Sequence, residues 1–131
     1  MKITKIIQAK NVFLEASRKK LSFALSRKLF KFCKAAEVEE EFYRDKYREA
    51  VAEVAQTDGK GKILTNKDGS IKYKEGKTEA ELNKIIAEIN NVEVDDFNFS
   101  FTEDELSTLD LSIGEQAILD DFIREDEVKE G

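Results

Sequence analysis

The longest regular pattern of hydrophobic positions lies in a stretch without Gly or Pro, between residues 11 and 56. Its apolar positions recur at spacings of three and four residues, which places them on one face of an α-helix. The positions are Leu21, Leu25, Leu29, Phe32 and Ala36, followed by Tyr43, Tyr47, Ala50 and Val54. Mostly acidic residues fill the gap between the two sets, at 37–41. The pattern predicts either one long N-terminal helix of about 40 residues or a helical hairpin that breaks near residues 37–41.

Shorter segments with a period of two predict a small β component. Residues 2–8 are rich in isoleucine with rough alternation, and they predict a short strand. Residues 62–74 contain two β-prone runs around the turn sequence Asn-Lys-Asp-Gly-Ser at 66–70. The glycine suits a positive φ angle, so this segment predicts a β-hairpin. Because a two-stranded hairpin is marginally stable alone, we expect it to dock on helices or on a partner.

A third strand is expected near residues 92–101. Phe97, Phe99 and Phe101 alternate with polar residues and would share one face of the strand. The alternation shifts by one position after two aspartates, which predicts a bulge or bend. Three rings on one face would form a large exposed apolar patch. We therefore favour packing of this strand on the long helix, with an apolar anchor for a partner as the alternative.

Capping-box sequences predict three further helix starts, at Thr78, Thr102 and Ser112, each with a glutamate three residues later. Together these patterns predict a helix-dominated α+β fold. A length of 131 residues fits one domain. We expect that domain over residues 1–123, followed by a charged tail at 124–131 that frays.

Charge is divided unevenly along the chain, although its net charge is only −6. Residues 1–36 hold ten Lys or Arg and one acidic residue, a net charge of +9. Residues 91–131 hold fourteen acidic residues and two basic ones, a net charge of −12. The two regions either face each other in the fold or form separate contact surfaces of opposite sign.

The composition excludes most catalytic chemistry. The chain has no His and one Cys, which excludes histidine bases, intrachain disulfides and cysteine zinc sites within one chain. Cys33 lies in an apolar helical pattern, and we interpret it as a core residue. The turn at 66–70 resembles part of a calcium loop, but the neighbouring lysines oppose a dication. We expect no enzymatic activity, no cofactor and no metal.

No stretch is apolar enough to form a signal-peptide core or to span a membrane, so we expect a cytoplasmic protein without membrane association. The basic residues of segment 18–34 are interleaved with Phe23, Phe30 and Phe32, a pattern that can bind nucleic acid. Because the whole chain is acidic, we interpret this segment as a solvated helix face with a phenylalanine core. Direct nucleic-acid binding is not expected.

Four segments share their layout with a known group of proteins. They are residues 25–29 in the basic helix, 42–47 in its acidic continuation, 68–71 in the hairpin, and 111–123 with the late capping turn. In this layout, and in its lysine- and glutamate-rich style without histidine, the chain resembles small uncharacterised accessory proteins of tailed bacteriophages of Gram-positive hosts. The resemblance implies a phage accessory protein in the host cell cytoplasm, and it implies no catalytic residues.

Two functions are consistent with these patterns. The first is a non-enzymatic, phage-encoded interaction protein that docks on a larger protein assembly. The alternative is a counter-defence inhibitor of the anti-CRISPR or anti-restriction type, whose acidic surface imitates nucleic acid and blocks a basic, nucleic-acid-binding enzyme of the host. In the first function the long helix and the hairpin dock on the assembly, whereas in the second the acidic residues of 91–131 form a bare surface that blocks the enzyme. We expect a protein partner that is engaged partly through charge, with the acidic C-terminal third supplying the contact. The oligomeric state is left open. The expected partner-binding residues are Asp95, Asp96, Glu103, Asp104, Glu105, Asp120 and Asp121.

Overall fold

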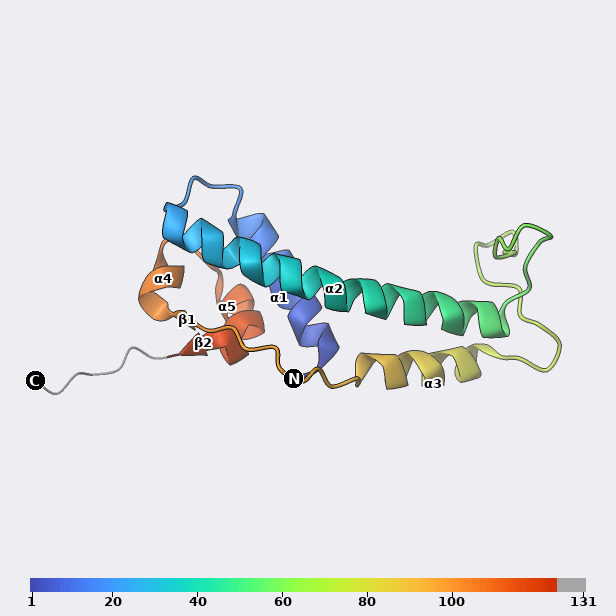
Figure 1. The fold of residues 1–131 in the computed structure, drawn as a ribbon. Helices are drawn as coiled ribbons and strands as arrows, with labels where there is room; N and C mark the ends of the chain where they lie inside the picture. The colour runs from blue at the N-terminus through green and yellow to red at the C-terminus, as the bar shows by residue number, and fades with distance from the viewer. Residues whose placement is uncertain (125–131) are drawn as a thin grey trace, which may run out of the picture. The chain divides into compact units, whose positions relative to one another are not determined.

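The computed structural model describes residues 1–124, which divide into two compact units (Figure 1). Unit 1 comprises residues 1–40 and 93–124, and unit 2 comprises residues 41–92. Helices dominate the described chain, which confirms the expected α+β class with its long helix in the N-terminal half. The expected single domain stays a prediction. Most of the expected charged tail, residues 125–131, lies outside the described residues.

The first element is a helix, α1 (Ile3–Ala16), so the strand expected at residues 2–8 is wrong. Of those residues only Lys2 pairs in an extended manner, as an antiparallel bridge to Glu93. Alternation within seven residues was a weaker signal than the helical period of the apolar residues over residues 3–16. The buried positions of α1 follow that period: Ile3, Ile6, Ala9, Val12, Phe13 and Ala16.

A single long helix, α2 (Phe23–Val54), carries nearly all of the two apolar sets. The break considered near residues 37–41 does not occur, because glutamate is a good helix former. The helix begins at residue 23 rather than near 11, and the interruption lies at residues 17–22. Ser22 explains this start. Its Oγ accepts a hydrogen bond from the backbone N–H of Leu25 (3.3 Å), as an N-cap serine does.

The core of unit 1 is built around the ring of Phe32, which projects from α2 and is fully buried. Its centroid lies 4.9 Å from that of Phe13 in α1 and 5.0 Å from that of Phe122. Both contacts are edge-to-face, a favourable geometry for aromatic rings. The rings of the expected strand surround it at centroid distances of 5.3 to 5.9 Å: Phe97, Phe99 and Phe101. The interpretation of these three rings as core over the long helix is confirmed.

The strand expected near residues 92–101 is wrong over most of its length. Within residues 1–124, regular pairing is limited to β1 (Phe101–Thr102) and β2 (Ile123–Arg124), which run parallel to each other. At Asp96 the backbone adopts a φ of +63°, a left-handed conformation that interrupts an extended chain. Residues 97–100 are therefore held on the core by ring packing rather than by a ladder of hydrogen bonds.

Two of the expected capping boxes are complete and start short helices. Helix α4 (Glu103–Ser107) follows Thr102, and helix α5 (Ile113–Leu119) follows Ser112. In each case the cap hydroxyl accepts a hydrogen bond from the backbone N–H three residues later, and the glutamate there accepts one from the cap's own N–H. A short 3₁₀ helix, Asp120–Phe122, continues from α5 toward β2.

Unit 2 combines the second half of α2 with α3 (Glu79–Asn90) and three extended segments. The expected hairpin is present, with an antiparallel bridge between Thr65 and Ile71 across the turn. Ile71 also packs against the buried cluster of α2 and α3, so the expected docking on helices is confirmed. Three backbone hydrogen bonds, 2.8 to 3.0 Å long, connect these segments in a closed triangle. The N–H of Gln56 donates to the carbonyl oxygen of Lys72, that of Lys72 to Leu64, and that of Leu64 back to Gln56.

We expect Phe32→Ala to lower the free energy of unfolding by about 3–5 kcal/mol, because it removes the central ring and leaves a cavity. Denaturant unfolding followed by circular dichroism measures this loss. Phe30→Ala is the matched control, since Phe30 lies on the same helix and is 52% exposed. That control should cost less than about 1 kcal/mol. Equal losses in the two variants would contradict the central position of Phe32.

Candidate protein-binding groove

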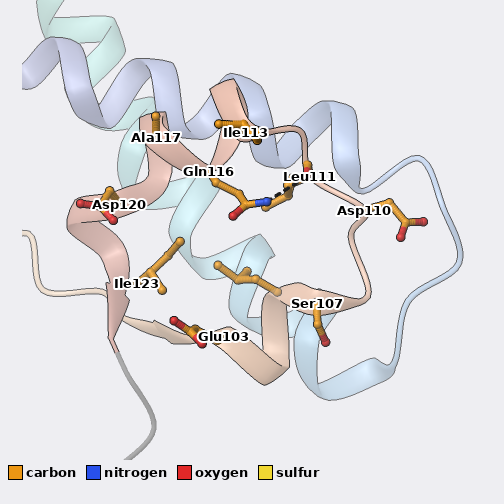
Figure 2. Close-up of a pocket in the computed structure, with 10 residues that line it drawn as sticks. Glu103, Ser107, Asp110, Leu111, Ile113, Gln116, Ala117, Asp120 and Ile123 are labelled. Atoms are coloured by element: carbon orange, nitrogen blue, oxygen red, sulfur yellow. Dashed lines mark hydrogen bonds between the residues drawn. The ribbon is translucent and has the colours of Figure 1, made fainter.

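A groove of about 780 Å³ opens on the surface of unit 1 (Figure 2). It is lined by α4, α5, β2 and the loop between the two helices, and we call it the α4–α5 groove. Its floor is apolar and consists of Leu106, Leu111, Ala117 and Ile123, and Ile113 lies at its edge. Three carboxylates line it as well, and we call them its rim: Glu103, Asp110 and Asp120. Ser107 and Gln116 complete the lining.

The loop at residues 108–112 connects α4 to α5 and shapes the groove. Asp110 adopts a φ of +53°, a left-handed conformation that Asp tolerates better than most residues, and this turns the chain between the helices. Leu109 is buried and ties the loop to the core. The Nε2 of Gln116 donates a hydrogen bond to the carbonyl oxygen of Leu111 (3.1 Å), which ties α5 back to the loop (Figure 2).

The groove leaves apolar side chains open to solvent. Leu106 is buried and Leu111 and Ile123 are half-buried, whereas Ile113 is 87% exposed. Ile113 is the first residue of α5, directly after the Ser112 cap, so the packing of the helix does not require an apolar residue there. An exposed apolar residue at the edge of an apolar groove is typical of a surface that a partner covers.

Lysines of the first 36 residues pair with acidic residues of the C-terminal third. The N–O distances are 2.8 Å for Lys28–Glu105, 2.6 Å for Lys19–Asp110 and 2.5 Å for Lys5–Asp121. The interpretation in which the basic and acidic regions face each other is confirmed for these three pairs.

Two of the pairs lower the pKa of their acidic member. The hydrogen bond from the Lys28 ammonium lowers the pKa of Glu105, and the backbone N–H of Thr102 adds to this effect. Lys19 lowers the pKa of Asp110 in the same way. Glu105 therefore stays ionised at neutral pH, and its carboxylate serves the fold as both an ion-pair partner and a helix cap.

The seven expected partner-binding residues fall into two groups. Glu105 and Asp121 are paired with lysines. The others make no ion pair within 4 Å among residues 1–124, and they are Asp95, Asp96, Glu103, Asp104 and Asp120. Only Glu103 and Asp120 line the α4–α5 groove. The structure thus brings two of the seven residues to one site, and partner binding by the seven stays a prediction.

Sequence reasoning missed the apolar floor of the groove. The Ser112 capping box predicted a helix start, with no division of the following apolar residues between two faces. In the structure Leu119 is buried, whereas Ile113 and Ala117 lie four residues apart on another face of α5 and line the groove. A second apolar face on a short helix was the signal that could have revealed the site.

Other candidate residues have structural roles. Burial raises the pKa of the Cys33 thiol, and Cys33 packs against the core, as expected. Asp68 accepts hydrogen bonds from the backbone N–H and the hydroxyl of Ser70 (3.0 and 2.6 Å), so its carboxylate stabilises the hairpin turn. Within residues 1–124 no three acidic or cysteine side chains are grouped so as to hold a metal ion. In the same part of the chain no helix combines the length and the apolar character needed to cross a membrane.

Comparisons of the chain with protein-family models, with curated proteins and with solved structures found no match. What the protein does therefore has to follow from its own geometry and charge.

Stability should fall in acid in a way that depends on Lys28. Because the folded-state pKa of Glu105 is lowered, its ion pair stabilises the fold above the unfolded pKa of about 4.3, and this stabilisation is lost as the pH falls through the lower folded value. We expect Lys28→Met to cost about 0.5–1 kcal/mol at neutral pH. The part of that difference that comes from the ion pair should vanish once the pH has fallen below the lowered folded-state pKa of Glu105.

Denaturant unfolding of both proteins at several pH values measures this difference. Lys31→Met is the matched control, because Lys31 is an exposed lysine of the same helix without an ion pair in the described part of the chain. It should show little cost at any pH. A cost of Lys28→Met that does not change with pH would contradict the role of the ion pair.

Proposed function

We propose that the protein is a non-enzymatic interaction protein that binds a basic, amphipathic segment of a protein partner in the α4–α5 groove. One observation carries this proposal. The groove combines an apolar floor open to solvent with two rim carboxylates, Glu103 and Asp120, that have no ion-pair partner within residues 1–124. A segment with apolar and cationic side chains complements both features.

The floor and the rim would contribute in different ways. Apolar side chains buried against Leu111, Ile113 and Ile123 would supply most of the affinity, at about 25 cal/mol per Å² of apolar surface removed from water. The rim carboxylates would steer a cationic segment toward the groove and fix its orientation, which affects the association rate and specificity more than the affinity.

The ion pairs support docking on a protein over imitation of nucleic acid. A mimic needs a continuous bare array of carboxylates. Five of the seven expected residues are without an ion pair within residues 1–124, but lysines of the chain itself pair with Glu105, Asp110 and Asp121, which interrupts such an array. The resemblance to phage accessory proteins extends the proposal. Such a protein would act in the cytoplasm of the host cell, where the groove would dock it on a larger assembly.

A designed helical peptide with leucine on one face and lysine on the other tests this proposal. We expect the peptide to bind the wild-type protein in a fluorescence anisotropy titration, because its leucines fit the floor and its lysines meet the rim. An otherwise identical peptide with glutamate in place of lysine is the control. It should bind at least about tenfold more weakly.

A pair of protein variants locates the binding site. The double variant Glu103→Lys with Asp120→Lys should weaken binding of the lysine peptide by a similar factor. The matched double variant Glu79→Lys with Glu88→Lys makes the same charge change on exposed residues of α3 and should bind like the wild type. Equal binding of the two peptides, or equal losses in the two double variants, would contradict the groove as the site.

A further inference from the structure

Unit 1 has a second exposed surface, and its charge is opposite to that of the groove. Phe23 begins α2 and is 84% exposed. Among the large hydrophobic residues of 1–124, only Ile113 is more exposed. Exposed cations lie on both sides of Phe23 in the sequence, Lys20 in the preceding loop and Arg27 about one helical turn later. We call Phe23 and these two cations the Phe23 knob.

The knob has few partners within its own chain. Lys20 and Arg27 make no ion pair within 4 Å among the residues that the structure describes. Phe23 belongs to neither hydrophobic cluster of the described chain, and its high exposure means that it does not fill the groove of its own copy. Burial of this exposed ring by a partner would therefore lower the free energy, because it removes apolar surface from water.

We propose that the Phe23 knob of one copy binds in the α4–α5 groove of a second copy. This inference rests on the proposed function, because it names the basic, amphipathic segment that the groove accepts. The ring would enter the apolar floor, while Lys20 and Arg27 would face Glu103 and Asp120. A groove of about 780 Å³ is large enough to take the ring together with neighbouring side chains of α2.

Charge favours this pairing over contact between two grooves. Ile113 at the edge of each groove could also be covered by the Ile113 of a second copy. Such a contact would bring Glu103 and Asp120 of both copies together, and four carboxylates at close range repel one another. The knob instead brings cations to the same rim. The two arrangements therefore respond to salt in opposite directions, because salt screens attraction and repulsion alike. Salt should weaken the knob-in-groove contact and strengthen the contact between two grooves.

Sedimentation equilibrium of the wild-type protein is the first measurement. A contact built on one ring and two cations lies at the small end of protein interfaces, so we expect association to appear across about 10–500 µM protein. The mean mass should rise above that of one chain in low salt and fall when salt is raised. A mass of one chain at all concentrations in low salt, or association that strengthens with salt, would overturn the proposal.

Complementation between two variants tests the contact itself. Phe23→Ser removes the ring of the knob and keeps the groove. Glu103→Lys with Asp120→Lys reverses the charge of two rim residues and keeps the knob. Each variant alone should associate at least about tenfold more weakly than the wild type. When mixed, they should form a 1:1 complex, because one copy still supplies an intact groove and the other an intact knob.

Two further measurements keep the outcomes distinct. Phe42→Ser is the matched control, since Phe42 is another exposed phenylalanine of α2 and should leave association unchanged. Circular dichroism melting of every variant verifies that each is folded. Failure of the mixture to form the 1:1 complex would overturn the knob-in-groove contact. If the wild-type protein then still bound the lysine peptide, the groove would remain a binding site for another protein, and only the identity of its occupant would be wrong.

Discussion

The contact of Phe32 with five other rings is the interaction on which unit 1 depends. These rings come from α1, from residues 97–101 and from the turn after α5. The C-terminal segments have little regular structure of their own, since their strands are two residues long and their helices span seven residues or fewer. Packing on Phe32 therefore fixes their positions. The rings at residues 97–101 and Phe122 lie before and after α4 and α5 in the sequence, so their packing holds the two helices that form the α4–α5 groove.

Charge supplies a second, weaker constraint that also shapes the site. The chain separates basic residues at its start from acidic residues near its end, and the fold brings part of each set together. Lys5, Lys19 and Lys28 neutralise three of the acidic residues. Such exposed pairs contribute little to stability. Their main consequence is that they determine which carboxylates of the groove stay unpaired. Glu103 and Asp120 are the two without an ion-pair partner in residues 1–124.

Features that depend on nearby residues could be predicted from the sequence. The caps at Thr102 and Ser112 are set by residues three positions apart, and the turn after Asn66 is set by its own side chains. The helix over residues 23–54 followed from its long apolar period. The interruption at 17–22 was missed because it carries no Gly or Pro, only a serine whose capping role depends on the chain around it.

Features that depend on distant contacts could not be predicted in the same way. Phe97 and Phe99 alternate as they would in a strand, but they lie in irregular backbone because Phe32 offers a better partner than a neighbouring strand. The groove is harder still to predict, because it depends on the relative positions of elements that are themselves fixed by distant contacts. Of its three rim residues, Glu103 and Asp120 were among those expected from charge and Asp110 was not. Its floor combines residues of two short helices, their connecting loop and a strand, and the core sets the positions of these elements.

Amide hydrogen exchange tests most directly whether the Phe32 core holds the groove in place. The comparison is between the wild-type protein and Phe32→Leu, which keeps most of the side-chain volume and removes the ring contacts. We expect exchange across residues 101–123 to accelerate by about tenfold or more in the variant, while amides of α3 keep their rates. A variant whose exchange at 101–123 matches the wild type, or rises no more than it does in α3, would contradict the dependence of the groove on Phe32.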